Sequence, residues 1–110
     1  MTGNHSKGKA MERDWIRLHP DLECFDIPMG KFNDNDAFGI ADIIALGLTG
    51  VVHFVQVCHR STVARHRNAI QAFVDAHTPP REYVIALYSW KARKPQGKPA
   101  IVDWRFEGVW

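Results

Sequence analysis

The sequence predicts an α/β domain in which helices flank a mixed central sheet, with the element order α-β-β-β-α-β-β. Two amphipathic segments have the 3.6-residue period of a helix, and the segments between and after them are short apolar or alternating runs typical of strands. The 110 residues, 45% apolar and 24% charged, are typical of one soluble globular domain. Turn-forming residues separate the runs, and no internal repeat is present.

The N-terminal segment predicts a flexible tail followed by a helix. Residues 1–7 are polar, and we expect the single domain to occupy residues 8–110. Residues 8–18 predict a short helix because apolar side chains recur at helical spacing from Met11 to Leu18. A His-Pro pair follows, and the residue before a proline avoids the helical conformation.

Three strands are expected next. Residues 22–28 alternate in polarity and predict a strand that ends at a proline. Residues 38–47 and 51–59 are mostly apolar, and a short segment ending in Gly50 separates them. This arrangement predicts an antiparallel hairpin that is buried on both faces.

The second half of the chain predicts a helix and two strands. Residues 61–77 carry apolar side chains along one face, and either Ser61 or Thr62 is suited to cap the helix. Residues 82–90 and 100–110 predict strands. The basic segment between them, which contains proline and glycine, predicts a loop.

Charge and cysteine content narrow the protein class only slightly. A net charge of +2 and a pI of 8.7 do not by themselves indicate nucleic-acid binding. Cys24 and Cys58 lie in apolar strands, so we expect reduced thiols. No metal-binding cysteine or histidine spacing, membrane-length apolar run or signal-peptide pattern is present. We therefore expect the cytoplasm of a prokaryote or of a phage-infected cell.

The predicted hairpin places polar groups inside apolar strands. Side chains alternate along a strand, so Gln56 and Cys58 are expected on one face. Counting back through the turn places Asp42 opposite position 55 or 56, within about 5 Å between side-chain bases. An ionised aspartate in an apolar strand is unfavourable unless it is paired. A bound Mg²⁺ would balance the charge; a strand-bend cap or an arginine partner is the structural alternative.

These motifs resemble the PD-(D/E)xK nuclease superfamily, especially its archaeal Holliday-junction resolvase and RecB-type branches. Gly39-Ile40-Ala41-Asp42 is similar to the Gly-x-x-Asp motif, and Gln56-Val57-Cys58 stands at the E-x-K position. Ser6-Lys7-Gly8 followed by Glu12-Arg13 resembles the opening helix of the resolvases.

The resemblance implies a restriction-endonuclease-like fold and a metal-dependent endonuclease that cuts DNA, including branched DNA. The implied catalytic positions are Glu12, Asp42, Gln56 and Cys58. The implied ligands of Mg²⁺ or Mn²⁺ are Glu12, Asp42, Gln56 and the backbone carbonyl of Val57. It also implies a homodimer, because a four-way junction needs two symmetric cuts.

The chain departs from the family pattern at two positions. Gln56 offers a neutral oxygen instead of a carboxylate, and Cys58 cannot supply the positive charge of the usual lysine. Lys31, Arg60 or Arg65 is expected to provide the missing cation. We expect slow or absent cleavage, and the alternative function is a catalytically weak or inactive module that binds nucleic acid or a protein partner.

Basic residues near the predicted site and in the last loop are candidates for contacts with DNA phosphates. They are Lys7, Lys31, Arg60, Arg65, Arg67, Lys91, Arg93 and Lys94. The alternative is that these side chains form ordinary solvated surfaces. The four tryptophans are expected in the core or at a dimer interface rather than as stacking platforms for bases.

Overall fold

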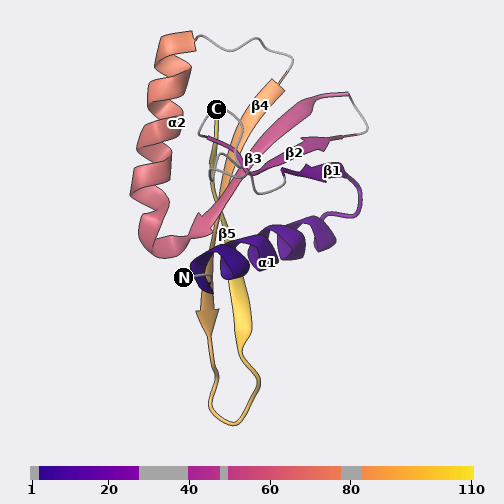
Figure 1. The fold of residues 1–110 in the computed structure, drawn as a ribbon, viewed down its shortest axis with the longest axis vertical. Coiled ribbons are helices and arrows are strands. Elements are labelled where there is room, and N and C mark those ends of the chain that lie inside the picture. The colour runs from indigo at the N-terminus through magenta and orange to yellow at the C-terminus, as the bar shows by residue number, and fades with distance from the viewer. Residues whose placement is uncertain (1–2, 28–39, 48–49, 78–82) are drawn as a thin grey trace.

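The computed structural model describes residues 3–27, 40–47, 50–77 and 83–110, which form two α-helices and a five-stranded sheet (Figure 1). The elements are α1 (Gly3–Arg17), β1 (Glu23–Asp26), β2 (Ile43–Leu46), β3 (Val52–His59), the short 3₁₀ helix η1 (Arg60–Thr62), α2 (Val63–His77), β4 (Tyr83–Arg93) and β5 (Ile101–Val109). The predicted α/β class and the order of the elements are confirmed.

The sheet follows the order of the chain, β1-β2-β3-β4-β5. The pairings β1–β2, β2–β3 and β4–β5 are antiparallel, whereas β3 and β4 are parallel. Parallel neighbours need a crossover connection, and α2 supplies it. The hairpin of β4 and β5 extends beyond the rest of the molecule (Figure 1).

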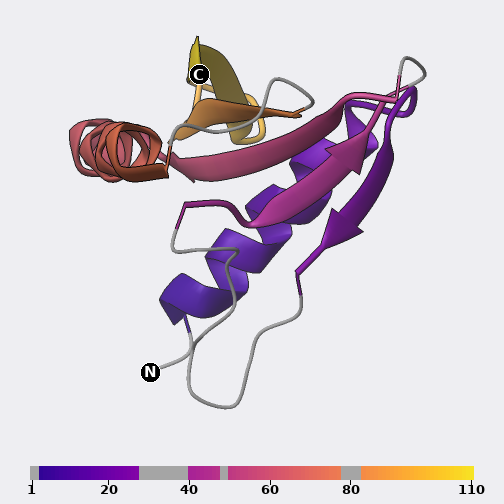
Figure 2. The same ribbon diagram turned by 90° about the horizontal axis from the view of Figure 1, so that it is seen from above.

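Alternation along β3 divides the apolar core into two clusters. Val55 and Val57 pack in a cluster with Trp15 of α1. Cys58 points the other way and packs with Ile70 of α2. Each helix therefore packs against its own cluster, and Figure 2 shows α1 below β2 and β3 while α2 lies beyond the end of β3, away from most of α1.

Several element boundaries differ from the sequence prediction. α1 begins at Gly3 rather than at Gly8, so the predicted flexible tail is largely helical; the side chains of residues 1–7 lie outside the described part. β2 begins at Ile43 rather than at residue 38, and residues 38–39 lie outside the described part of the chain. β4 continues to Arg93, into the predicted loop, because its last residues pair with the start of β5.

The tryptophans lie in the core or pack against it, which agrees with the predicted core location. Trp15 and Trp90 are buried. Trp104 packs against the α1 cluster and donates its indole N–H to Asp14 at 2.9 Å. Trp110 packs against the α2 cluster and donates to Gln71 at 3.0 Å. These bonds attach β5 and the C-terminal residue to the two helices.

Both cysteines are free thiols, which confirms the expectation of reduced cysteines. Cys24 is half-buried in β1, and Cys58 is buried near the end of β3. In the described ranges, neither helix has the length and apolar character needed to cross a bilayer.

Candidate functional site

Asp42 and Gln56 meet at the start of the β2–β3 hairpin. The register pairs Ile43 with Val55, which places the residue before Ile43 beside Gln56. The Gln56 amide donates a hydrogen bond to Asp42 Oδ2 at 2.6 Å. It also donates to the carbonyl oxygen of Val57 at 3.1 Å. The predicted convergence of Asp42 with Gln56 is therefore confirmed.

The backbone holds Asp42 although β2 begins only at the next residue. Its N–H donates to the Val55 carbonyl at 2.9 Å, and its carbonyl accepts from the N–H of Ile27 at 3.1 Å. Asp42 is thus fixed between the end of β1 and the middle of β3. These two backbone hydrogen bonds fix the position of Asp42 at the start of an interior strand of the sheet.

A lysine and two further carboxyl groups lie close by, on α1 and β1. Lys9 Nζ lies 3.0 Å from Glu12 Oε1 and 3.0 Å from Asp26 Oδ1, and it also donates to the carbonyl of Ile27. The ammonium group thus uses three acceptors, its full donor capacity. We call Lys9, Glu12, Asp26, Asp42 and Gln56 the acidic centre.

The electrostatics of the acidic centre favour the protonated form of one carboxyl group, that of Glu12. Burial, a hydrogen bond shared with Asp26 and the nearby Asp42 charge raise the pKa of Glu12 to about 8, although Lys9 opposes the shift. Burial disfavours the Lys9 ammonium, but its bonds to Asp26 and Glu12 outweigh this cost and raise its pKa. At neutral pH Lys9 is therefore charged, and Glu12 carries the proton.

Cys58 follows Gln56 on the same face, as predicted, but it belongs to the α2 core. Its side chain packs in a cluster that contains Ile70 and Ile85. Burial raises the pKa of the Cys58 thiol, and a hydrogen bond with Thr62 opposes this shift. The thiol is therefore neutral at physiological pH and supplies no charge at the E-x-K position.

The predicted substitutes for the missing cation do not reach the acidic centre within the described residues. Arg60 instead donates to Ser89 Oγ at 3.2 Å and to the Asp103 carbonyl at 3.0 Å. Arg65 donates to His66 at 3.5 Å on the surface of α2. Lys31 lies outside the described residues. Arg60, in η1, is therefore directed toward β4 and β5, and Arg65 is exposed on α2, so neither is observed to supply the missing cation at the acidic centre.

The other predicted DNA contacts are spread over separate surfaces. Arg67 lies 3.3 Å from Glu107, and Arg93 lies 2.6 Å from Asp103. Lys91 and Lys94 are exposed on the β4–β5 hairpin. The side chain of Lys7 lies outside the described residues. The described basic residues therefore do not form one continuous patch around the acidic centre.

The sequence prediction missed Lys9 and Asp26. Lys9 precedes Glu12 by one helical turn, and this spacing brings charged side chains together. Asp26 is the last residue of β1, a strand for which the sequence predicted no functional residue. The helical spacing before Glu12 could have indicated Lys9. No local sequence pattern indicates that Asp26, at the end of β1, lies close to Lys9.

Carboxylate and carbonyl oxygens are the donors that Mg²⁺ prefers, and the acidic centre contains both. Within the described ranges, however, no three histidine, cysteine, aspartate or glutamate side chains are close enough together to hold a metal ion. Metal binding here requires the Val57 carbonyl or the Gln56 side-chain oxygen to complete the donor set.

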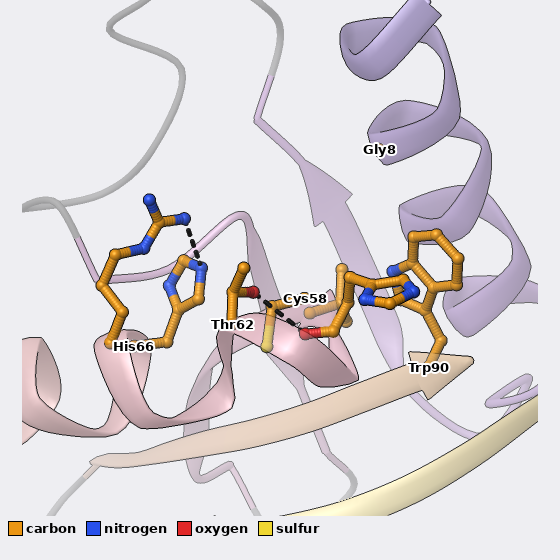
Figure 3. A pocket seen from close by; sticks show the side chains of 8 residues that line it. Gly8, Cys58, Thr62, His66 and Trp90 are labelled. Atoms are coloured by element: carbon orange, nitrogen blue, oxygen red, sulfur yellow. Dashed lines mark hydrogen bonds between the residues drawn. The ribbon is translucent and has the colours of Figure 1, made fainter.

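A pocket of about 440 Å³ lies next to the acidic centre (Figure 3). It opens between α1, the end of β3 and the first turn of α2. The described residues that line it are Gly8, Val57, Cys58, His59, Thr62, Arg65, His66 and Trp90. We call it the Gly8 pocket.

Comparison of the chain with protein-family models, with curated proteins and with solved structures found no match. The functional interpretation therefore depends on the residues themselves and on their geometry.

Proposed function

We propose that the chain has a restriction-endonuclease-like fold and acts as a metal-dependent DNA endonuclease of the Holliday-junction-resolvase type. The observation that carries the proposal is the meeting of Asp42 and Gln56 at 2.6 Å, next to the carbonyl of Val57. These groups come from the two motif positions that resemble the nuclease superfamily. Glu12, the third predicted ligand, is buried and close enough to Asp42 for that charge to raise its pKa.

The topology supports the same proposal. The order α-β-β-β-α-β-β and a mixed central sheet flanked by helices are what the resemblance implies, and the described elements have this order and a mixed sheet. The Gly-x-x-Asp motif ends at the start of β2, and the E-x-K position lies in β3.

The residues of the acidic centre suit a hard divalent cation. Asp42, Glu12, the Val57 carbonyl and the Gln56 side-chain oxygen would hold Mg²⁺ or Mn²⁺, once the Gln56 amide turns its oxygen toward the ion. The ion would polarise a phosphodiester group and lower the pKa of an attacking water. Lys9 supplies the positive charge that Cys58 lacks, from α1 instead of β3. The carboxyl groups of Glu12 and Asp26 hold the Lys9 ammonium within the acidic centre.

Cleavage that depends on Asp42 tests the proposal. We expect the protein to cut a four-way DNA junction slowly in Mg²⁺ or Mn²⁺ and not at all in EDTA. Asp42→Asn is expected to reduce the rate at least about 100-fold, since it removes a negative metal ligand. Gel assays with junction, linear duplex and single-stranded substrates measure the rate.

The matched control for Asp42 is Asp75→Asn, because Asp75 is an exposed aspartate of α2. This variant should keep the wild-type rate. Equal cleavage by the Asp42→Asn protein would show that the activity comes from another site or from a contaminant.

Metal binding should release a proton. Glu12 holds a proton at neutral pH, and a divalent cation binds the ionised carboxylate. Calorimetric titrations with Mn²⁺ at pH 7, in two buffers of different ionisation enthalpy, should show nearly one proton released per ion. Affinity should rise as pH increases from 6 to 8. Binding without proton release would exclude Glu12 as a ligand.

A second candidate function is a nuclease-fold module that binds nucleic acid without cutting it. The specific observation in its favour is that the oxygens of the acidic centre already have donors. The Gln56 amide bonds to Asp42 and to the Val57 carbonyl, while Lys9 bonds to Glu12 and Asp26. DNA binding by both wild type and Asp42→Asn, with no cleavage by either, would favour this function.

The expected homodimer stays a prediction. It is supported by exposed apolar side chains on β5, the last strand of the described sheet. They are Ile101, Phe106 and Val109. A strand edge with such side chains is suited to pairing with a second copy.

A further inference from the structure

The Gly8 pocket combines an aromatic wall and a cationic wall. On one side the rings of His59 and Trp90 pack edge to face, with centroids 4.8 Å apart and planes at 89°. On the other side His66 projects from the start of α2 (Figure 3), and the neighbouring Arg65 also lines the pocket. Aromatic rings favour contact with a nucleobase, and a guanidinium group favours a phosphate.

The floor of the pocket carries no charge that opposes an anion. It contains the thiol of Cys58 and the hydroxyl of Thr62, which donates to the His59 carbonyl at 2.9 Å. Among the described residues that line the pocket, none is acidic. Val57, which lines the pocket, accepts a hydrogen bond from Gln56 of the acidic centre through its backbone carbonyl.

Gly8 leaves the pocket open on the α1 side. A Cβ atom at this position would meet no atom within 4 Å. Glycine inside a helix lowers stability by roughly 0.5–1 kcal/mol relative to alanine. No steric requirement of the described structure demands glycine here, and the absence of a side chain leaves this wall of the pocket open.

We propose that the Gly8 pocket binds one unstacked nucleotide, with its base against the exposed His59 ring, which the buried Trp90 supports edge to face, and its phosphate at Arg65. This proposal rests on the proposed function, which makes the nucleotide part of a DNA substrate. A nucleotide held in this pocket lies next to the acidic centre. It specifies a substrate with an unpaired nucleotide, from a single strand, a branch point or a flipped base. A uniform duplex does not present such a nucleotide without unstacking.

The test measures binding of thymidine 5′-monophosphate, thymidine and inorganic phosphate to the full chain in EDTA. Titrations followed by NMR chemical shifts or by calorimetry give the affinities. We expect 1:1 binding of the nucleotide, and affinities at least about tenfold lower for thymidine and for phosphate, since each lacks one of the two contacts.

Gly8→Leu fills the pocket without removing any existing side chain. It should weaken nucleotide binding at least about tenfold while the thermal midpoint stays equal or rises, because leucine is a better helix former than glycine. Gly8→Ala controls for the helix effect and should keep most of the affinity. Arg65→Gln should also weaken binding, whereas Lys98→Gln, which removes an exposed charge outside the pocket, should not.

Each other result overturns the inference. If phosphate binds as tightly as the nucleotide, the base makes no contribution and the pocket is only an anion-binding site. A Gly8→Leu protein with full affinity would place the ligand elsewhere, and absence of nucleotide binding would refute the pocket. Because these titrations contain no metal, nucleotide binding without DNA cleavage contradicts only the endonuclease proposal, and metal-dependent cleavage without nucleotide binding contradicts only the pocket.

Discussion

Replacing Lys9 by methionine is expected to lower the free energy of unfolding by about 2–4 kcal/mol at pH 8. The substitution keeps most of the aliphatic side chain but removes the ammonium group that donates to Glu12, Asp26 and the Ile27 carbonyl. The Lys9 and Glu12 side chains are only 14% and 8% exposed, so water replaces the lost partner poorly. Breaking one side of a buried ion pair leaves an uncompensated charge, which is the main cost.

The same helix provides a matched control for Lys9. Arg17 and Asp14 also form an ion pair at a spacing of three residues, but the Arg17 side chain is 70% exposed. Arg17→Met should change the free energy of unfolding by less than about 1 kcal/mol, as is usual for surface pairs. Urea unfolding of both variants in EDTA measures the difference, and equal effects would mean that the acidic centre is well solvated.

The effect of Lys9→Met should also depend on pH and on metal. At pH 5 Glu12 is protonated, because its pKa is raised to about 8, so the loss of stability should be smaller than at pH 8. Mn²⁺ should raise the thermal midpoint of Lys9→Met more than that of the wild type, because the freed oxygens become available to the ion. A midpoint that Mn²⁺ leaves unchanged in both proteins would contradict the fit of a divalent cation to the acidic centre.

Glu12→Gln is expected to remove a pH-dependent loss of stability. The folded-state pKa of Glu12 is raised from 4.5 to about 8, so between these values the native state holds a proton that the unfolded state has lost. The contribution of Glu12 to stability is therefore complete below about pH 4.5 and is lost as pH rises through 8, at about 1.4 kcal/mol per pH unit. Glutamine keeps the shape and never ionises.

Urea titrations at several pH values between 5 and 9 measure this effect. Relative to the wild type, Glu12→Gln should gain stability as pH rises, by a few kcal/mol at pH 8. Glu23→Gln is the control, because Glu23 is exposed on β1, and it should follow the wild-type curve. Parallel curves for wild type and Glu12→Gln would show that Glu12 is ionised across this range in the folded protein.

The meeting of Asp42 with Gln56 was predictable because two local rules determine it. Side chains alternate along a strand, and a short turn limits how two neighbouring strands can be aligned. The structure pairs Ile43 with Val55, and the hydrogen bond follows from that register. Both residues lie in one hairpin, so no distant contact was needed to infer their proximity.

Lys9, Asp26 and the role of Cys58 were not predictable in the same way. The Lys9–Asp26 contact depends on how α1 packs against β1, and no periodicity within either segment specifies that packing. Arg60 was one candidate for the missing cation, but its bond to the Asp103 carbonyl joins η1 to β5, 43 residues further along the chain. Contacts of this kind arise from packing between elements that are distant in the chain.

The sequence alone determined the order of helices and strands, the hairpin and the single carboxylate–amide pair, because hydrophobic period and turn residues act over a few neighbouring positions. Only the tertiary structure decided that a lysine from α1 neutralises the carboxyl groups, that Glu12 keeps its proton and that Cys58 is buried beside a pocket. These features depend on burial and on charges brought together from α1, β1, β3 and α2. No local pattern encodes the distances between those elements.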